Sequence, residues 1–326
     1  MNHLESSFTG RNGAWRYLLM LVTILLATNT IGALPLLVGY FSKVAGDPDI
    51  LSKIADDPAN IGVLGFDSNI ALLMNLFPFI IGILAFALLI KPLNQRTFGA
   101  VINGGRGFRW KRFFISASVW LILSALYLFV SMKADPSNFR LNNSSGTLLP
   151  LILICLALIP FQAAFEEILF RGYLMQGFTV LSRNRWLPIL MTSILFGLMH
   201  SFNPEVSEFG FMMMMPQYIF FGLIFAVVTV FDDGIEAAIG AHAANNIFLC
   251  IMVTHKSSAL QTDAVFEQLK LYPMIELAGL IITGLIFIII MKKILKWGSW
   301  SLLTARVEPP AVIDQTPYTD VLSSVR

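Results

Sequence analysis

Long apolar runs separated by short polar segments dominate this chain. A helix needs roughly 20 mostly apolar residues to cross a bilayer. On that rule, the pattern predicts an all-α fold, a polytopic membrane protein built as a bundle of about eight transmembrane helices. The expected helices cover Tyr17–Phe41, Ile70–Ile90, Phe113–Met132, Leu148–Gln176, Trp186–His200, Phe211–Phe231, Ile235–Val253 and Met274–Ile294.

Composition supports the same class. Of the 326 residues, 56% are hydrophobic and only 13% are charged, whereas soluble domains carry about 25% charged residues. The expected surroundings are therefore a lipid bilayer, and no feature indicates nucleic acid as a partner. The two cysteines, Cys155 and Cys250, both lie in apolar runs, so no disulfide framework is implied.

The chain divides by motif content into four stretches. Residues 1–147 hold the first three expected helices, 148–253 the candidate chemistry, and 254–300 the last helix. Residues 301–326 contain Pro309-Pro310 and few apolar runs, so they are expected to form a disordered cytoplasmic tail.

Lys and Arg predict the orientation in the membrane, because cytoplasmic loops are enriched in these residues. The loop Lys91–Arg112 carries six of them and is expected to be cytoplasmic. Alternation of eight helices then places both termini in the cytoplasm, with sixteen of the 22 Lys and Arg residues on that side. The pattern is compatible with a bacterial plasma membrane.

Two carboxylates and an arginine lie inside the fourth apolar run. Charges in hydrocarbon are costly, so such a cluster indicates a functional site. Glu167 and Arg171 are four residues apart and can pair on one helix face. Glu166 projects about 100° away, which leaves it free to act as a base with a raised pKa. Alternatively, all three residues anchor a helix end.

Two histidines and an asparagine lie in other apolar runs. His200 ends the fifth expected helix, and His242 shares a face of the seventh with Asn246. Taken singly, His200 could be an interfacial or packing residue, and Asn246 could join helices in a tight, alanine-rich bundle. Counted by helix rise, Glu166, His200 and His242 could converge in one cavity below the cytoplasmic surface.

These motifs resemble the CPBP family (CAAX proteases and bacteriocin-processing enzymes, also called Abi), which includes the Ras-converting CaaX endopeptidase. The family pattern matches Glu166-Glu167-x-x-x-Arg171, Phe196-x-x-x-His200 and His242-x-x-x-Asn246, within about Leu148–Val253.

The resemblance implies an intramembrane endopeptidase that hydrolyses a membrane-associated peptide or protein, with its cavity open to the cytosol. Glu166 would then activate the attacking water, assisted by His200, while His242 and Asn246 stabilise the oxyanion. Glu167 and Arg171 would support the site.

Several alternatives stay open. Relatives are often labelled metalloproteases, and zinc could be held by Glu166, His200 and His242, although no His-Glu-x-x-His helix is present. A membrane transporter also buries acids and histidines, but it usually shows half-repeats that this chain lacks. A bacteriocin-immunity scaffold with the same fold is the third alternative.

Overall fold

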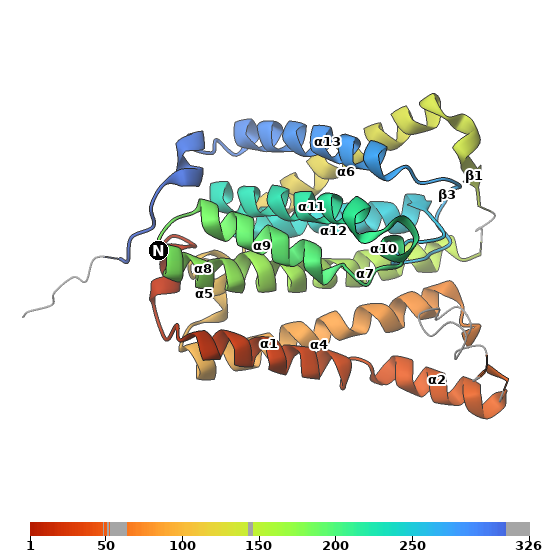
Figure 1. Ribbon diagram of the computed structural model, residues 1–326, viewed down its shortest axis with the longest axis horizontal. Helices are drawn as coiled ribbons and strands as arrows, with labels where there is room; N and C mark the ends of the chain where they lie inside the picture. Colours follow the sequence, from red (N-terminus) through yellow and green to blue (C-terminus); the bar gives the residue numbers. More distant parts are fainter. Residues whose placement is uncertain (48, 51, 53–63, 143–145, 311–326) are drawn as a thin grey trace, which may run out of the picture.

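The computed structural model describes residues 1–47, 49–50, 52, 64–142 and 146–310. Helices dominate it, in agreement with the predicted all-α class (Figure 1). The elements in chain order are η1 (Glu5–Phe8), α1 (Ala14–Asn29), α2 (Leu34–Gly46), α4 (Ser68–Asn94), α5 (Phe98–Asn103), α6 (Trp110–Ala134), η3 (Pro136–Asn138), β1 (Phe139–Leu141), α7 (Leu148–Glu167), η4 (Ile168–Leu174), α8 (Met175–Ser182), α9 (Trp186–Met199), α10 (Pro204–Phe209), α11 (Phe211–Asp232), α12 (Glu236–Met252), β2 (Val253–Thr254), β3 (Phe266–Gln268), α13 (Pro273–Ile294) and η5 (Trp300–Thr304).

The membrane character of the chain is confirmed. Among the described residues, six helical stretches are long and apolar enough to cross a bilayer, and α9 is a shorter apolar helix. Helix α12 lies between α6, α7 and α11, and most of its first nine residues are buried. It is therefore an interior helix that can carry polar side chains. The chain is a polytopic integral membrane protein.

The first expected helix, Tyr17–Phe41, is wrong as a single element. The structure divides it into α1 and α2, which together form one apolar stretch of 33 residues. The break follows from Pro35, which lies in the first turn of α2 and has no backbone N–H to continue the preceding helix. Helices α1, α2 and α4 lie along one side of the bundle (Figure 1).

The fourth expected helix extends beyond the predicted range, Leu148–Gln176, and contains a π-helical segment. Helix α7, η4 and α8 run on without interruption for 35 residues, Leu148–Ser182. The π-helical element η4 begins directly after Glu167 and includes Arg171. Wide turns of this kind occur frequently at functional sites. The sequence pattern gave no sign of it.

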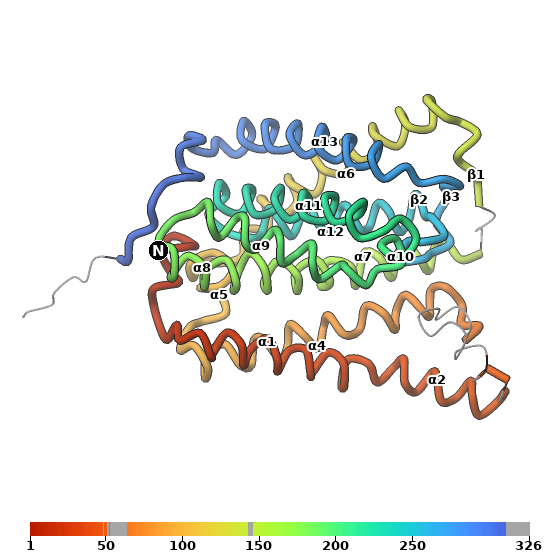
Figure 2. The backbone as a smooth tube through the Cα atoms, in the orientation of Figure 1, coloured from red at the N-terminus to blue at the C-terminus, as the bar shows by residue number. Residues whose placement is uncertain are grey.

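The two ends of the bundle differ (Figure 2). A small sheet of order β1-β3-β2 lies at one end, with β1 antiparallel and β2 parallel to β3. The N-terminus and the last described residues lie at the other end, where Leu4 and Val307 belong to one hydrophobic cluster.

The disordered tail expected from Ser301 is wrong for its first ten residues. They include most of η5, and Val307 is buried, with its N–H donating to the Arg183 carbonyl at 3.0 Å. Residues 311–326 of that expected tail lie outside the described residues.

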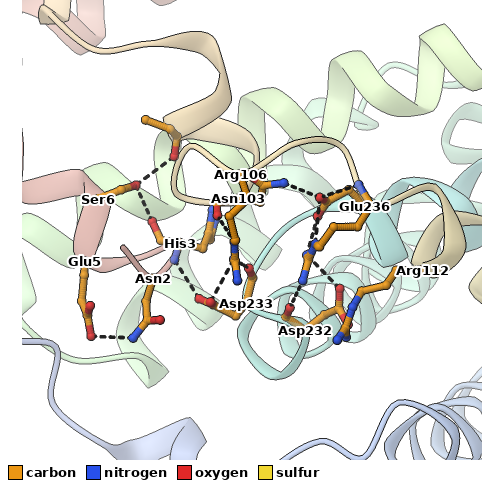
Figure 3. A network of polar contacts seen from close by, with 12 residues as sticks. Asn2, His3, Glu5, Ser6, Asn103, Arg106, Arg112, Asp232, Asp233 and Glu236 are labelled. Carbon is orange, nitrogen blue, oxygen red and sulfur yellow. Dashed lines mark hydrogen bonds and ion pairs between the residues drawn. The ribbon is translucent and has the colours of Figure 1, made fainter.

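An ion-pair network closes the end of the bundle that holds the N-terminus (Figure 3). Arg109 contacts Asp232 at 3.0 Å and also Glu236, while Arg106 contacts Asp233 at 2.9 Å. These pairs tie the segment before α6 to the turn between α11 and α12. The network therefore sets where α12 begins, and with it the height of His242 in the bundle.

Candidate active site

Glu167 is bound by two side chains: that of Arg171 in the π-helical segment and that of His242 in α12. Its Oε1 accepts from Arg171 Nη1 at 3.0 Å and lies 2.8 Å from His242 Nδ1. The Glu167 and Arg171 side chains are fully buried. A carboxylate paired with arginine can only accept, so His242 Nδ1 must carry the proton that it donates. This contact orients the imidazole and turns its other nitrogen toward Glu166.

Glu166 lies on the opposite side of the same imidazole. Its Oε2 is 3.7 Å from His242 Nε2, and the side chain keeps 13% of its surface exposed. The two neighbouring carboxylates therefore reach one histidine from two sides, although they project about 100° apart on the helix. Glu166 has no arginine partner among the described residues, in contrast to Glu167.

Gln162 links Glu166 to Asn246. The Gln162 amide Nε2 donates to Glu166 Oε1, and its Oε1 accepts from Asn246 Nδ2 at 2.9 Å. Asn246 also accepts from Asn245 Nδ2 at 3.0 Å. This chain of amides fixes the position of the Asn246 side chain beside Glu166.

His200 reaches the site from the end of α9. Its Nδ1 lies 2.7 Å from the Phe196 carbonyl, and a carbonyl can only accept, so Nδ1 donates and Nε2 is left free. The ring stacks on Tyr218, with centroids 4.6 Å apart and planes 19° apart. Phe196 also lies under the Arg171 guanidinium at 4.3 Å, so one aromatic ring touches both motifs.

All four predicted catalytic residues line one cavity. Its volume is about 370 Å³, which lies in the range of ligand sites. The lining combines polar and aromatic groups: Gln162, Glu166, His200, His242, Asn246, Phe196, Tyr218, Phe221 and Phe225. The expected convergence of the three motifs is therefore found.

The direction of the cavity differs from the expectation. From Glu166 it extends past Asn203 and Glu205 to the residues around β2 and β3, including Thr254 and Gln268. No residue of the arginine-rich loop 91–112 lines it. The expected opening of the cavity toward the arginine-rich end is therefore wrong. The reason is that His200 lies at the end of α9 remote from Arg185, so the cavity is built toward the sheet end.

Two glycines allow the helices of the site to approach closely. A Cβ at Gly222 would lie 2.8 Å from the Ser193 Cα, and one at Gly240 would lie 2.2 Å from the Phe113 carbonyl oxygen. Gly222 thus lets α11 pack on α9, and its carbonyl accepts from Arg171 Nη2 at 3.0 Å. Small residues permit such contacts between membrane helices.

Sequence reasoning missed several polar residues of the cavity, among them Gln162, Tyr218 and Glu205. Gln162 precedes Glu166 by four residues, so the helical spacing of polar groups in an apolar run could have indicated it. Tyr218 and Glu205 gave no comparable signal, because neither belongs to a periodic pattern or a motif. Only the packing of α11 against α9, and of α10 against α11, brings them beside His200.

The side chains do not form a zinc site as they stand. Within the described parts of the chain, no group of three or more His, Cys, Asp and Glu residues converges as a metal ion requires. His200 and His242 direct their Nδ1 atoms at the Phe196 carbonyl and at Glu167, which leaves Nε2 of each ring facing the cavity. These contacts also occur at metal-ligating histidines, so the lack of a third ligand among the described residues is what separates this site from a zinc site.

Comparison with known proteins finds a match over the part of the chain that holds this site. The family model for Rce1-like type II CAAX prenyl endopeptidases matches residues 147–248. YyaK, an uncharacterized protein of Bacillus subtilis (strain 168), is 26% identical over 289 residues, which cover 88% of this chain and 94% of YyaK. No solved structure matches the chain. The matched segment contains all three motifs, so residues 147–248 form an Rce1-like domain, of the CAAX-type protease family, within an integral membrane protein.

Proposed function

We propose that this protein is an intramembrane endopeptidase in which Glu166 activates the attacking water. The observation that supports it most is that two adjacent carboxylates have different partners. Glu167 is neutralised by Arg171, whereas Glu166 faces the cavity without a cationic arginine partner. A general base needs this combination of reach to solvent and freedom from a strong ion pair.

The proposed first step is attack of water on the scissile carbonyl carbon. Glu166 takes one proton from the water as the new C–O bond forms, and the carbonyl π electrons move to the oxygen. His200 Nε2, left free because Nδ1 is bound to the Phe196 carbonyl, would accept from the same water. Glu166 then gives its proton to the leaving amide nitrogen as the C–N bond breaks.

His242 and Asn246 are the proposed donors to the oxyanion. Fixed donors in a dry site stabilise this charge more than water does. Asn246 is held by Gln162 and Asn245. His242 Nε2 is the proposed donor when both ring nitrogens carry protons, because Nδ1 already donates to Glu167 at 2.8 Å.

The proposed substrate is a peptide or membrane-protein segment within the bilayer, and the proposed location is a bacterial plasma membrane with both termini cytoplasmic. The described Lys and Arg residues support this orientation. Most of them lie in segments at the end of the bundle where the N-terminus lies, as expected for a cytoplasmic face.

A cleavage assay tests the proposal. Purified protein in detergent or vesicles is incubated with a peptide library and a membrane proteome, and new termini are identified by mass spectrometry. Glu166→Gln is the decisive variant, because it keeps the shape of the side chain and a hydrogen-bonding amide but cannot take a proton. Glu208→Gln, at an exposed position outside the cavity, is the matched control.

We expect cleavage by the wild type and by Glu208→Gln, and loss of cleavage in a folded Glu166→Gln variant. Undiminished turnover by Glu166→Gln would refute the role of this residue. If the wild type cleaves nothing, the non-enzymatic alternatives, a transporter or an immunity scaffold, would be favoured instead.

A further inference from the structure

We propose that the substrate enters from the face of the membrane opposite the arginine-rich end, and that the acidic mouth there selects a segment carrying Lys or Arg. The proposal rests on the endopeptidase function above and adds to it the side of entry and the charge of the substrate. Three observations carry it: the charge of the two bundle ends, the course of the cavity, and the charged residues that line it.

The two ends of the bundle have opposite charge among the described residues. The segments at the end with the N-terminus (Figure 1) carry Arg11, Arg16, Lys91, Arg96, Arg106, Arg109, Lys111, Arg112, Arg183, Arg185, Lys292, Lys293, Lys296 and Arg306 against Glu5, Asp232, Asp233, Glu236 and Glu308. The described segments at the sheet end carry more acids than bases: Asp47, Asp49, Asp67, Asp135, Glu205, Glu208, Asp263, Glu267 and Glu276 against Lys43, Lys133, Arg140, Lys256 and Lys270. This asymmetry assigns the first end to the cytoplasm.

The catalytic cavity reaches the sheet end. Between Glu166 and the sheet it is lined by Asn203, Glu205 and Ala259. The Ala259 N–H donates to Glu205 Oε1 at 2.9 Å, which joins the segment after β2 to α10 across the rim. At the other end, the turn from α11 to α12 is closed by the ion pairs of Arg109 and Arg112. Access from the sheet end follows from this geometry.

The charged lining of the cavity has one sign. Its carboxylates are Glu166, Glu205 and Glu276, and no described Lys or Arg lines it. Glu276 accepts from Tyr127 and Gln268, and Glu205 accepts from a backbone N–H, so neither is neutralised by a basic side chain. Acids in a cleft with low-dielectric walls concentrate positive charge. A Lys or Arg near the scissile bond fits this mouth.

Site-directed labelling tests the side of entry. Single cysteines are introduced as Ala259→Cys at the cavity rim and Lys111→Cys at the arginine-rich end, in a background with Cys155→Ala and Cys250→Ala. Ala259 and Lys111 are both exposed. A bulky, membrane-impermeant maleimide is added to right-side-out and to inverted vesicles. Modification is read by mass, and cleavage of a library-derived peptide is then measured after solubilisation.

We expect Ala259→Cys to be modified only in right-side-out vesicles and Lys111→Cys only in inverted ones. The label should block cleavage at Ala259→Cys and leave it unchanged at Lys111→Cys. Modification of both cysteines from the same side, or full cleavage by labelled Ala259→Cys, would overturn the proposed entry. Labelling does not require catalysis, so it reports the side of entry independently. If the protein cleaves nothing before any label is added, that result counts against the endopeptidase function and not against the side of entry.

Matched peptides test the charge preference. Two peptides that differ only by Lys or Glu near the cleavage site are compared by kcat/KM with the wild type, Glu205→Gln and the exposed control Glu208→Gln. Gln keeps an acceptor for the Ala259 N–H. We expect the wild type and Glu208→Gln to favour the Lys peptide, and Glu205→Gln to reduce that preference by about fivefold through KM. Equal rates for both peptides with the wild type would overturn the charge selection.

Discussion

Glu167 and His242 lie 2.8 Å apart, Oε1 to Nδ1, although 75 residues separate them in the chain. Because Arg171 binds the same oxygen of Glu167, a single carboxylate links the π-helical segment after α7 to the middle of α12. The orientation of His242 therefore depends on the ion pair behind it. This dependence leads to the first prediction.

Loss of either partner of the Glu167–Arg171 pair should destabilise the fold. Both side chains are fully buried, so Glu167→Ala or Arg171→Ala leaves an uncompensated charge, at a cost of about 3–5 kcal/mol. Thermal unfolding of the purified variants measures the loss. In the double variant Glu167→Met/Arg171→Met the two effects should be less than additive. Wild-type yield and stability of both single variants would contradict the structural role.

Asn246→Ala should slow cleavage without unfolding the protein. Removal of one oxyanion donor typically lowers the rate by about 10²–10³, so the variant should be crippled but measurable. The change should appear in kcat, because the oxyanion exists only in the transition state. Asn29→Ala, on the exposed face of α1, is the matched control. A normal kcat for Asn246→Ala would remove this residue from the proposed mechanism.

Zinc content shows whether His200 and His242 act as hydrogen-bonding groups or as metal ligands. Because the described side chains form no cluster suited to a metal ion, we expect less than one equivalent of zinc per chain and cleavage that survives chelators. Metal analysis of the purified protein and assays with a chelator measure both. One equivalent of zinc, with activity lost on chelation and restored by zinc, would instead make the two histidines metal ligands.

Gly222→Ala should disturb the contact between α9 and α11. The new Cβ would lie 2.8 Å from the Ser193 Cα and 2.9 Å from its carbonyl oxygen, so the helices must separate. Overpacking of this kind costs about 1–3 kcal/mol, and His200 on α9 should move with it. Lower Tm and lower cleavage are expected together. Gly46→Ala, with no atom within 4 Å of its Cβ, should change neither; equal behaviour of the two variants would refute the packing argument.

His3 should make stability depend on pH. Burial lowers its pKa from 6.5 to about 4, while the ring lies 3.0 Å from the Arg171 carbonyl. In the unfolded chain, His3 therefore binds a proton below pH 6.5. In the folded chain it does so only below about pH 4. The contribution of His3 to the free energy of unfolding is fully present above pH 6.5 and is lost as the pH falls toward 4. The loss amounts to about 3 kcal/mol.

The measurement for His3 is unfolding of the wild type and of His3→Gln at pH 7 and at pH 4. Because Gln does not titrate in this range, the variant should lose less stability on acidification than the wild type. Parallel losses in the two proteins would show that other groups control the acid response.

The sequence determined the class of the molecule and the composition of its site. Hydrophobic runs of membrane length require helices, because backbone groups in hydrocarbon must be satisfied within the segment. The motif residues were also identifiable, because ionisable side chains in such runs are rare and costly. These inferences use only local composition and spacing, so they do not depend on how the helices pack.

Tertiary structure decided how the site is connected and where it opens. Which nitrogen of His242 faces Glu166, the amide link through Gln162, and the place of Tyr218 and Glu205 beside His200 all result from contacts between distant helices. The direction of the cavity was likewise not readable from helix counting. It depends on the segments after α9 and α12 meeting at the rim through Glu205 and Ala259. Such contacts depend on helix tilt and packing, and no single segment of the sequence encodes them.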